Sequence, residues 1–180
     1  FRHTGEAIAN KIGLIPENRK TQGLVQILPV WENMTMVALD KCKKNGVINY
    51  GVIRETCELY KKSLNVKTPS INTVIQNLSG GNQQKVIIAK WLFRDCDILL
   101  IDEPTQGIDV MVKEEIYKII RNLADEGKSM IVVSSELDEL LRICDNIIVM
   151  FDGKEVMTSS KENFNPDKIL SVSVTGRNES

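Results

Sequence analysis

The chain has 180 residues, of which 42% are hydrophobic and 26% charged, and its formal net charge is −1 at pH 7. These values are typical of one globular domain with a hydrophobic core, and the near-neutral charge argues against a nucleic-acid-binding surface. The four cysteines are widely separated and there is one histidine, so we expect reduced thiols, and neither a disulfide framework nor a zinc site.

The first part of the chain predicts one strand and then a mainly helical region. Residues 12–15 are apolar and end at a proline, which predicts a buried strand, and residues 17–23 predict a polar loop. Helical spacing of apolar residues follows over about 31–76, most clearly over 47–64, and a short helix is expected at 71–75. We therefore expect a small helical subdomain here.

From residue 82 onward, predicted helices and strands alternate. The expected helices are 82–93, 110–126, 136–142 and 166–171, and the expected strands are 97–101, 130–133, 146–151 and 155–157. Asp152-Gly153 predicts a hairpin turn, and residues 175–180 predict a frayed tail. The apolar strands at 98–101 and 130–133 suit a parallel sheet that is covered on both faces. The alternation predicts an α/β layered sheet.

A glycine-rich run precedes the helix predicted at 82–93. The first N–H groups of a helix have no helical partner, and the helix dipole favours an anion there. Gly80 and Gly81 would let a phosphate approach closely, and Ser79 adds a hydroxyl donor. Taken alone, these three residues favour a serine N-cap and a glycine turn. The polar residues 82–85 and the strand that follows favour the phosphate interpretation instead.

Two carboxylates, Asp102 and Glu103, follow the apolar strand at 98–101. Open α/β sheets bind ligands at the carboxyl ends of their strands. Asp102 could hold Mg²⁺ there, and Glu103 could orient and deprotonate an attacking water. The alternative is that the two carboxylates only cap the following turn.

A further glycine-containing run is a decoy. Gly127-Lys128-Ser129 resembles the end of a GxxxxGK[ST] phosphate loop, but position 122 is an asparagine rather than a glycine. The run also leads from a helix into a strand, whereas a phosphate loop leads from a strand into a helix. We therefore interpret Gly127 as the end of the helix 110–126, and no such phosphate loop stands elsewhere in the 180 residues.

Several runs together resemble ABC transporter nucleotide-binding subunits. They are P-E-N-R-K-T-Q-G-L at 16–24, N-V-K-T-P at 65–69, L-S-G-G-N-Q-Q-K-V at 78–86, D-E-P-T-Q-G-I-D-V at 102–110 and V-S-S-E at 133–136. The narrower resemblance is to the second ATPase domain of tandem-domain subunits of bacterial monosaccharide importers, of the ribose, galactose, xylose and arabinose type. Asn18 stands where that group has aspartate. The resemblance covers about residues 7–171.

The resemblance implies a partial P-loop NTPase (ABC ATPase) fold with an inserted helical subdomain and without the Walker A region. It divides the chain into four regions. Residues 1–30 would hold the Q-loop strand and loop of the core, and 31–77 the helical subdomain. Residues 78–160 would hold the signature helix, the Walker B strand and the remaining core, and 161–180 the C-terminal helix and tail.

The resemblance also implies residue roles, with ATP and Mg²⁺ as cofactors. The signature residues Ser79, Gly80, Gly81, Asn82 and Gln83 would contact ATP bound to a facing domain. Asp102 would serve Mg²⁺, Glu103 would be the catalytic base, and Gly107-Ile108-Asp109 would be the D-loop that crosses the dimer interface.

Two positions depart from the general ABC pattern. Glu17 stands at the Q-loop position, where most such ATPases have glutamine, and Ser135 at the H-loop position, where most have histidine. A serine can neither become a cation nor reach as far as a histidine. We therefore expect that this domain contributes its signature loop to another site and is itself a poor catalyst.

The implied function is an ATPase subunit that powers monosaccharide import, with the isolated chain inactive. The longest apolar runs are too short to span a bilayer, and the N-terminus lacks a signal-peptide pattern. We therefore expect a peripheral protein on the cytoplasmic side of the membrane, docked on the permease through the helical stretch 31–76. Its other expected partners are a facing ATPase domain of the same subunit or a second copy and, indirectly, a periplasmic or extracellular sugar-binding protein.

Two alternatives stay open from the sequence. One is a non-catalytic interaction module, in which the α/β core serves as a dimer surface. The other is a soluble ABC ATPase of DNA repair or translation. The neutral charge, the absence of long heptad repeats and the P-E-x-R-K run argue against that second alternative and against a nucleic-acid partner. Separately, without a phosphate-loop strand and its helix, apolar strands such as 130–133 and 147–150 would lack cover, so we expect self-association or strand exchange.

Overall fold

The computed structural model describes residues 1–44 and 46–177. The chain divides into two compact units, residues 1–133 and 134–180, so the boundary falls inside the region 78–160 that the sequence grouped together. Within the described ranges, none of the helices combines the length and the apolar content needed to cross a bilayer. The last three residues of the tail expected to fray lie outside the described residues.

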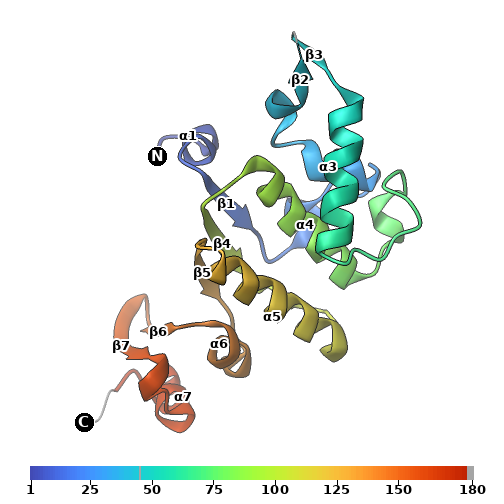
Figure 1. Cartoon of the computed structure of the whole chain (residues 1–180). Helices are drawn as coiled ribbons and strands as arrows, with labels where there is room; N and C mark the ends of the chain where they lie inside the picture. Colours follow the sequence, from blue (N-terminus) through green and yellow to red (C-terminus); the bar gives the residue numbers. More distant parts are fainter. Residues whose placement is uncertain (45, 178–180) are drawn as a thin grey trace. The chain divides into compact units, whose positions relative to one another are not determined.

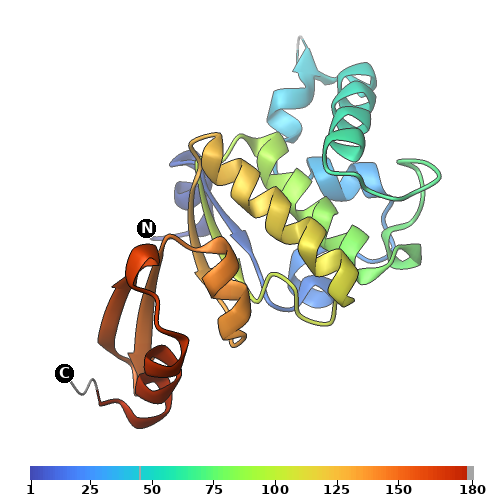
Figure 2. The ribbon, with the colours of Figure 1, turned by 60° about the horizontal axis from the view of Figure 1, so that its bottom comes forward.

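The first unit is built on a parallel sheet with the strand order β1-β4-β5 (Figure 1). These strands are Ile12–Ile15, Ile98–Asp102 and Ser129–Val133, which confirms the three strands predicted in this unit. Helices α4 (Gly80–Arg94) and α5 (Val110–Asp125) lie side by side along it (Figure 2), and a short helix α1 (Thr4–Ala9) that the sequence did not predict precedes β1. The helix predicted at 110–126 ends as expected, because Gly127 adopts a φ of 91°.

Among the described residues, one face of this sheet is buried and the other is exposed. Leu99 and Ile101 of β4 point into the core, whereas Leu14, Ile131 and Val133 are 50%, 61% and 58% exposed. The register pairs Leu14 with Leu100 and Leu100 with Ile131, so the exposed residues share one face. The prediction that these strands are covered on both faces is therefore wrong. Their apolar sequence is typical of a sheet that is covered on both faces, yet the described residues of this unit cover one face.

The helical subdomain lies between β1 and α4 in the chain. It contains α2 (Val30–Thr35), the 3₁₀ turns Leu39–Cys42 and Ile75–Asn77, and α3 (Tyr50–Ser63). The mainly helical prediction is confirmed, but the short helix predicted at 71–75 is wrong, because only the 3₁₀ turn that begins at Ile75 forms there. Two strands of two residues each, β2 (Lys43–Lys44) and β3 (Val47–Ile48), were not predicted.

The start of α3 explains why this helix is shorter than the range 47–64 over which apolar residues have helical spacing. Asn49 adopts an extended backbone, and its side-chain Oδ1 accepts hydrogen bonds from the N–H groups of Gly51 and Val52, at 2.9 and 3.3 Å. An asparagine N-cap of this kind satisfies N–H groups that the helix leaves unpaired. The cap therefore starts the helix at Tyr50, after the small hairpin.

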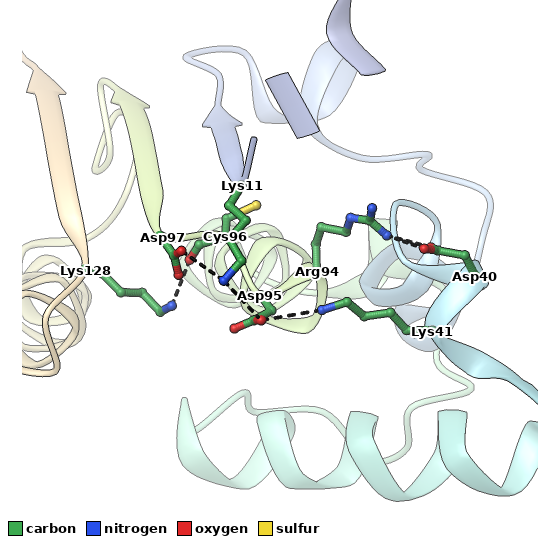
Figure 3. A network of polar contacts seen from close by, with 8 residues as sticks. All are labelled: Lys11, Asp40, Lys41, Arg94, Asp95, Cys96, Asp97 and Lys128. Atoms are coloured by element: carbon green, nitrogen blue, oxygen red, sulfur yellow. Dashed lines mark hydrogen bonds and ion pairs between the residues drawn. The ribbon is translucent and has the colours of Figure 1, made fainter. Parts of the chain in front are cut away.

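A polar network connects the helical subdomain to the base of the sheet (Figure 3). Its members are Lys11, Asp40, Lys41, Arg94, Asp95, Cys96, Asp97 and Lys128. The Nη1 atom of Arg94, at the end of α4, donates to both carboxylate oxygens of Asp40, at 2.6 and 2.7 Å. Lys128 donates to the Cys96 carbonyl at 2.8 Å, which gives this residue of the decoy run a structural role.

The second unit is a hairpin packed on helices. It contains α6 (Leu137–Ile143), β6 (Asn146–Phe151), β7 (Lys154–Ser160), a 3₁₀ turn (Lys161–Asn163) and α7 (Pro166–Thr175). The predicted hairpin turn is confirmed, with φ values of 48° at Asp152 and 73° at Gly153. Its core holds Ile147, Val149, Ile169 and Val172. Among the described residues, β6 pairs only with β7.

Candidate functional site

The helix α4 begins at the serine of the glycine-rich run. Ser79 is exposed and occupies the N-cap position with an extended backbone, but its side chain makes no capping hydrogen bond. Its Oγ instead accepts a hydrogen bond from Nδ2 of Asn82 at 2.9 Å, and Oδ1 of Asn82 accepts from the Lys67 N–H at 2.7 Å. The helix start therefore keeps the N–H groups that favour an anion.

The two glycines of this run lie against the loop that follows β4. A Cβ atom at Gly80 would stand 2.5 Å from Nη2 of Arg19 and 3.4 Å from the Gly107 carbonyl oxygen. A Cβ at Gly81 would come within 2.2 Å of Cγ1 of Val112. Gly81 is thus needed for packing against α5, whereas a side chain at Gly80 would displace the end of the Arg19 side chain.

The fifth residue of the predicted signature set is placed differently from the others. Gln83 is buried, and its Nε2 donates to the backbone carbonyls of Ile75 and Leu78, both at 3.2 Å. Gln83 therefore holds the segment before α4, and its contact with ATP stays a prediction.

A buried lysine in the same helix has a structural role as well. Lys85 is almost fully buried, its Nζ donates to the Asn65 carbonyl at 2.9 Å, and it forms an ion pair with Glu115 of α5. Burying a lysine is costly unless it is paired and hydrogen-bonded, and here it is both. This contact fixes α4 against α5, and the sequence did not predict it.

The two predicted carboxylates lie at the carboxyl end of β4, where the sheet leads into a tight loop. Asp102 pairs in register with Val133 of β5, and both carboxylate residues are partly exposed. Glu103 adopts the left-handed backbone region, with φ 46°, and its N–H donates to the Val133 carbonyl at 2.8 Å. Such a backbone is uncommon for a residue other than glycine and occurs often at functional sites.

The loop continues into α5 beside the start of α4. Gly107 has a φ of 64°, Ile108 is buried, and Asp109 is an exposed N-cap whose side chain makes no capping hydrogen bond. The next two residues, Val110 and Met111, are 75% and 81% exposed. The segments 79–82 and 107–111, which lie far apart in sequence, therefore form one surface that combines polar groups and exposed apolar side chains.

The two positions that depart from the family pattern have different surroundings. Glu17 is exposed, and its Oε1 accepts a hydrogen bond from Nε2 of Gln106 at 2.9 Å. Ser135 is exposed and belongs to the second unit. The first unit therefore brings Glu17 to the loop after β4, a contact that the sequence did not predict.

The predicted magnesium ligand, Asp102, lies at the partly exposed end of β4. Mg²⁺ usually binds through one or two carboxylates together with phosphate oxygens. Asp102 supplies a carboxylate of this kind. In residues 1–44 and 46–177, no group of three or more His, Cys, Asp or Glu side chains could hold a metal ion.

Sequence reasoning missed Arg19 at this site. Its Nη1 donates to the Gln106 carbonyl at 2.6 Å, and its Nη2 lies 3.4 Å from the Gly107 carbonyl. Burial lowers the pKa of its guanidinium. The P-E-N-R-K run at 16–20 was the available signal, but a motif match does not say which residue its arginine contacts.

Comparison with known proteins places these motifs in a family. The family model for ABC transporters matches residues 2–106. The chain is 47% identical over 165 residues to a putative ribose/galactose/methyl galactoside import ATP-binding protein of Halalkalibacterium halodurans, covering 92% of this chain and 32% of the relative. It is 41% identical over 178 residues to the ribose import ATP-binding protein RbsA of Rhodopirellula baltica, covering 99% and 35%. The chain therefore spans about a third of the length of these relatives.

Solved structures agree on the fold. A dimeric post-hydrolysis state of the ATP-binding cassette MJ0796, bound to ADP and Pi, is 25% identical with a TM-score of 0.70, covering 86% of this chain and 65% of that one. The ADP conformation of MJ1267, an ATP-binding cassette of an ABC transporter, is 20% identical with a TM-score of 0.70, covering 94% and 67%. The predicted ABC ATPase fold is thereby confirmed.

Proposed function

Because this chain belongs to the ABC transporter family, we propose that it contributes the signature loop to a composite ATP site that powers the import of a monosaccharide. The observation that carries this proposal is the surface formed by segments 79–82 and 107–111. Exposed Ser79 and Asp109 offer polar groups there, and Val110 and Met111 offer apolar area that a protein partner would cover. The import function in the names of the relatives supports a sugar as the cargo.

The proposed partner across this surface is a facing ATPase domain, in the same subunit or in a second copy. Residues 1–180 contain no GxxxxGK[ST] loop, so the phosphate cradle of the composite site would come from that domain. Ser79, Gly80 and Gly81 would then meet the γ-phosphate from the opposite side, with Asn82 holding the Ser79 hydroxyl. MJ0796, which was solved as a dimer with ADP and Pi, supports a pairing of this kind.

A second, weaker site would belong to this chain's own carboxylates. Asp102 would help to hold Mg²⁺, which neutralises phosphate charge when it is bound, and Glu103 would orient the attacking water. Glu17 and Ser135 replace the glutamine and histidine of the usual pattern. We therefore infer that this site is a poor catalyst.

The helical subdomain is the proposed docking region for the membrane permease. It contains an apolar cavity of about 190 Å³, whose lining includes Trp31, Met36 and Tyr50. A cavity of this kind suits an apolar side chain of a partner. Docking there would hold the chain at the cytoplasmic side of the membrane, and the sugar-binding protein would act through the permease.

The test is Ser79→Arg in the whole subunit, assembled with its permease and binding protein. A long cation at the helix start would block the γ-phosphate, so we expect transport-coupled ATP hydrolysis to fall by about a hundredfold or more. Ser171→Arg on α7 is the matched control, because Ser171 is an exposed serine too. Unchanged hydrolysis in Ser79→Arg would refute the proposal.

The chain alone gives an independent check. We expect neither MgATP binding by calorimetry nor phosphate release, because the phosphate loop is supplied elsewhere. Turnover by the isolated chain that Glu103→Gln abolishes would show that the chain has its own nucleotide cradle.

A further inference from the structure

We propose that Arg19 is a positioning residue that holds the D-loop, residues 107–109, against the signature helix α4. The inference rests on the proposed function, since it concerns the same surface. The guanidinium donates to the Gln106 carbonyl at 2.6 Å and lies 3.4 Å from the Gly107 carbonyl. The same group passes so close to Gly80 that a Cβ there would stand 3.2 Å from Cζ of Arg19. One side chain thus touches both segments of the surface.

The loop that carries Arg19 is itself fixed to α4 at its other end. This loop forms a π-helix, Arg19–Gly23, and Asn18 caps it by accepting a hydrogen bond from the Thr21 N–H at 3.2 Å. The buried Lys90 of α4 donates to the Gly23 carbonyl at 2.7 Å. The π-helix is therefore capped at its start by Asn18 and attached to α4 at its end, which fixes the backbone that carries Arg19.

Glu17 adds a second link from the same loop. Its Oε1 accepts from Nε2 of Gln106 at 2.9 Å, whereas Arg19 binds the main-chain carbonyl of Gln106. The loop after β1 thus holds Gln106 through its side chain and its backbone. A movement of that loop would move the D-loop with it.

Hydrogen bonds rather than apolar packing hold this contact. Arg19, Gly80 and Gly107 line a polar cavity of about 400 Å³, so the contact borders open space. The Nε of Arg19 is buried and, among the described residues, has no acceptor. The orientation of the guanidinium is therefore set by its hydrogen bonds to the carbonyls of Gln106 and Gly107. A lysine at position 19 has a single ammonium group and could not span both carbonyls in the same plane.

The first experiment measures amide hydrogen exchange in the full 180-residue chain. We expect Arg19→Lys and Arg19→Ala to speed exchange in residues 105–109 by about tenfold or more, because the amides of Gln106 and Ile108 report closure of this loop. Lys20→Ala is the control, since Lys20 is the exposed neighbour, and it should leave exchange there unchanged. Exchange in Arg19→Lys equal to that of the wild type would overturn the proposal.

The second experiment uses the whole importer. If the D-loop is misplaced, kcat should fall about tenfold while KM for MgATP stays within about twofold, since the nucleotide first binds on the facing domain. An equal change in KM with kcat intact would also overturn the proposal. A wild-type importer without ATPase activity would refute the proposed function. The exchange experiment would still test whether Arg19 holds the D-loop. If neither Arg19 variant folds, Glu17→Ala must speed exchange at Gln106, or the proposal fails.

Discussion

At the residue scale, Gly81 is where packing most clearly excludes any other residue. An added Cβ would overlap Val112 of α5, at 2.2 Å from its Cγ1 atom. We expect Gly81→Ala to lower the free energy of unfolding by about 1–3 kcal/mol, the usual cost of overpacking. The gain in helix propensity, about 1 kcal/mol at most, does not offset this. Urea denaturation of the wild type and of Gly81→Ala measures the difference in the free energy of unfolding.

The double variant Gly81→Ala/Val112→Ala tests the stated cause. Removing the two methyl groups of Val112 makes room for the new Cβ, so the pair should show a coupling energy of about 1 kcal/mol in the direction of recovery. Additive losses in the double variant would mean that the clash with Val112 is not the reason that glycine stands there.

The cysteines give a prediction on thiol reactivity. Burial raises the pKa of Cys57 to about 12 and also raises those of Cys42 and Cys96, and all three are buried. Because the thiolate is the reactive form, we expect the native chain to react with Ellman's reagent quickly only at Cys144, which is partly exposed. Cys144→Ser should remove the fast phase, and unfolding should release all the thiols. A second fast thiol in the native chain would contradict this.

The place of a proposed site residue in the fold could be predicted from the sequence where a local motif carries that residue. Ser79, Asp102 and Glu103 stand next to a predicted helix start or strand end, and the structure places them there. Arg19 could not be predicted as part of the site. Its contact with Gln106 depends on how distant segments pack, and one sequence has no local signal for that.

At the scale of elements, the pair between Asp40 and Arg94 ties the helical subdomain to α4. The hydrogen bond that Asp40 accepts from Arg94 lowers the pKa of Asp40 below its ordinary value of 3.8. Since the folded pKa is depressed, the stabilisation is complete above pH 3.8 and is lost as pH falls through the lower, folded value. Asp40 is largely exposed, so we expect Asp40→Asn to cost at most about 1 kcal/mol at neutral pH.

Urea titrations at neutral pH and at about pH 3 measure this dependence. The difference between wild type and Asp40→Asn should shrink at the lower pH. In the Arg94→Gln background, Asp40→Asn should have little effect at either pH. A difference that stays constant with pH would exclude the carboxylate as its source.

Elements differ in how well apolar spacing predicts them. Helix α5 is long and its apolar residues recur on one face, whereas α4 is long and buried on most sides, and the predicted ranges of both fall within two residues of the observed ones. Strands β2 and β3 have two residues each, which is too short for any periodicity. The short helix expected at 71–75 fails for a related reason, since a few apolar residues do not distinguish a helix from a turn.

At the scale of the whole molecule, spacing predicts a strand but not its partner. Residues 146–151 form the expected strand, yet the described β6 pairs with β7 alone. Strand pairing depends on which elements lie on either side, and a strand's own residues specify that weakly. The same limit explains why the prediction of burial on both faces of β4 and β5 failed.

The exposed sheet face supports the prediction of self-association. Within the described residues β5 pairs only with β4, and its sequence, S-M-I-V-V, contains no charge that would protect an edge strand. Ile131 and Val133 expose their side chains there. We expect sedimentation velocity of the 180-residue chain to show dimers or larger species whose share rises with concentration. Ile131→Lys should shift them towards monomer, because it places a charge in the apolar contact.

Val47→Lys is the control, since Val47 of β3, like Ile131, is an exposed β-branched aliphatic residue of a strand, but it lies in the helical subdomain. If Val47→Lys disperses the assemblies to the same extent as Ile131→Lys, the added charge, rather than loss of the apolar face, causes the dispersal. A monomer at every concentration would mean that the apolar face is tolerated in water. Assemblies that disappear when a facing ATPase domain is supplied would instead show that the exposed strand has a specific partner, which links self-association to the composite site.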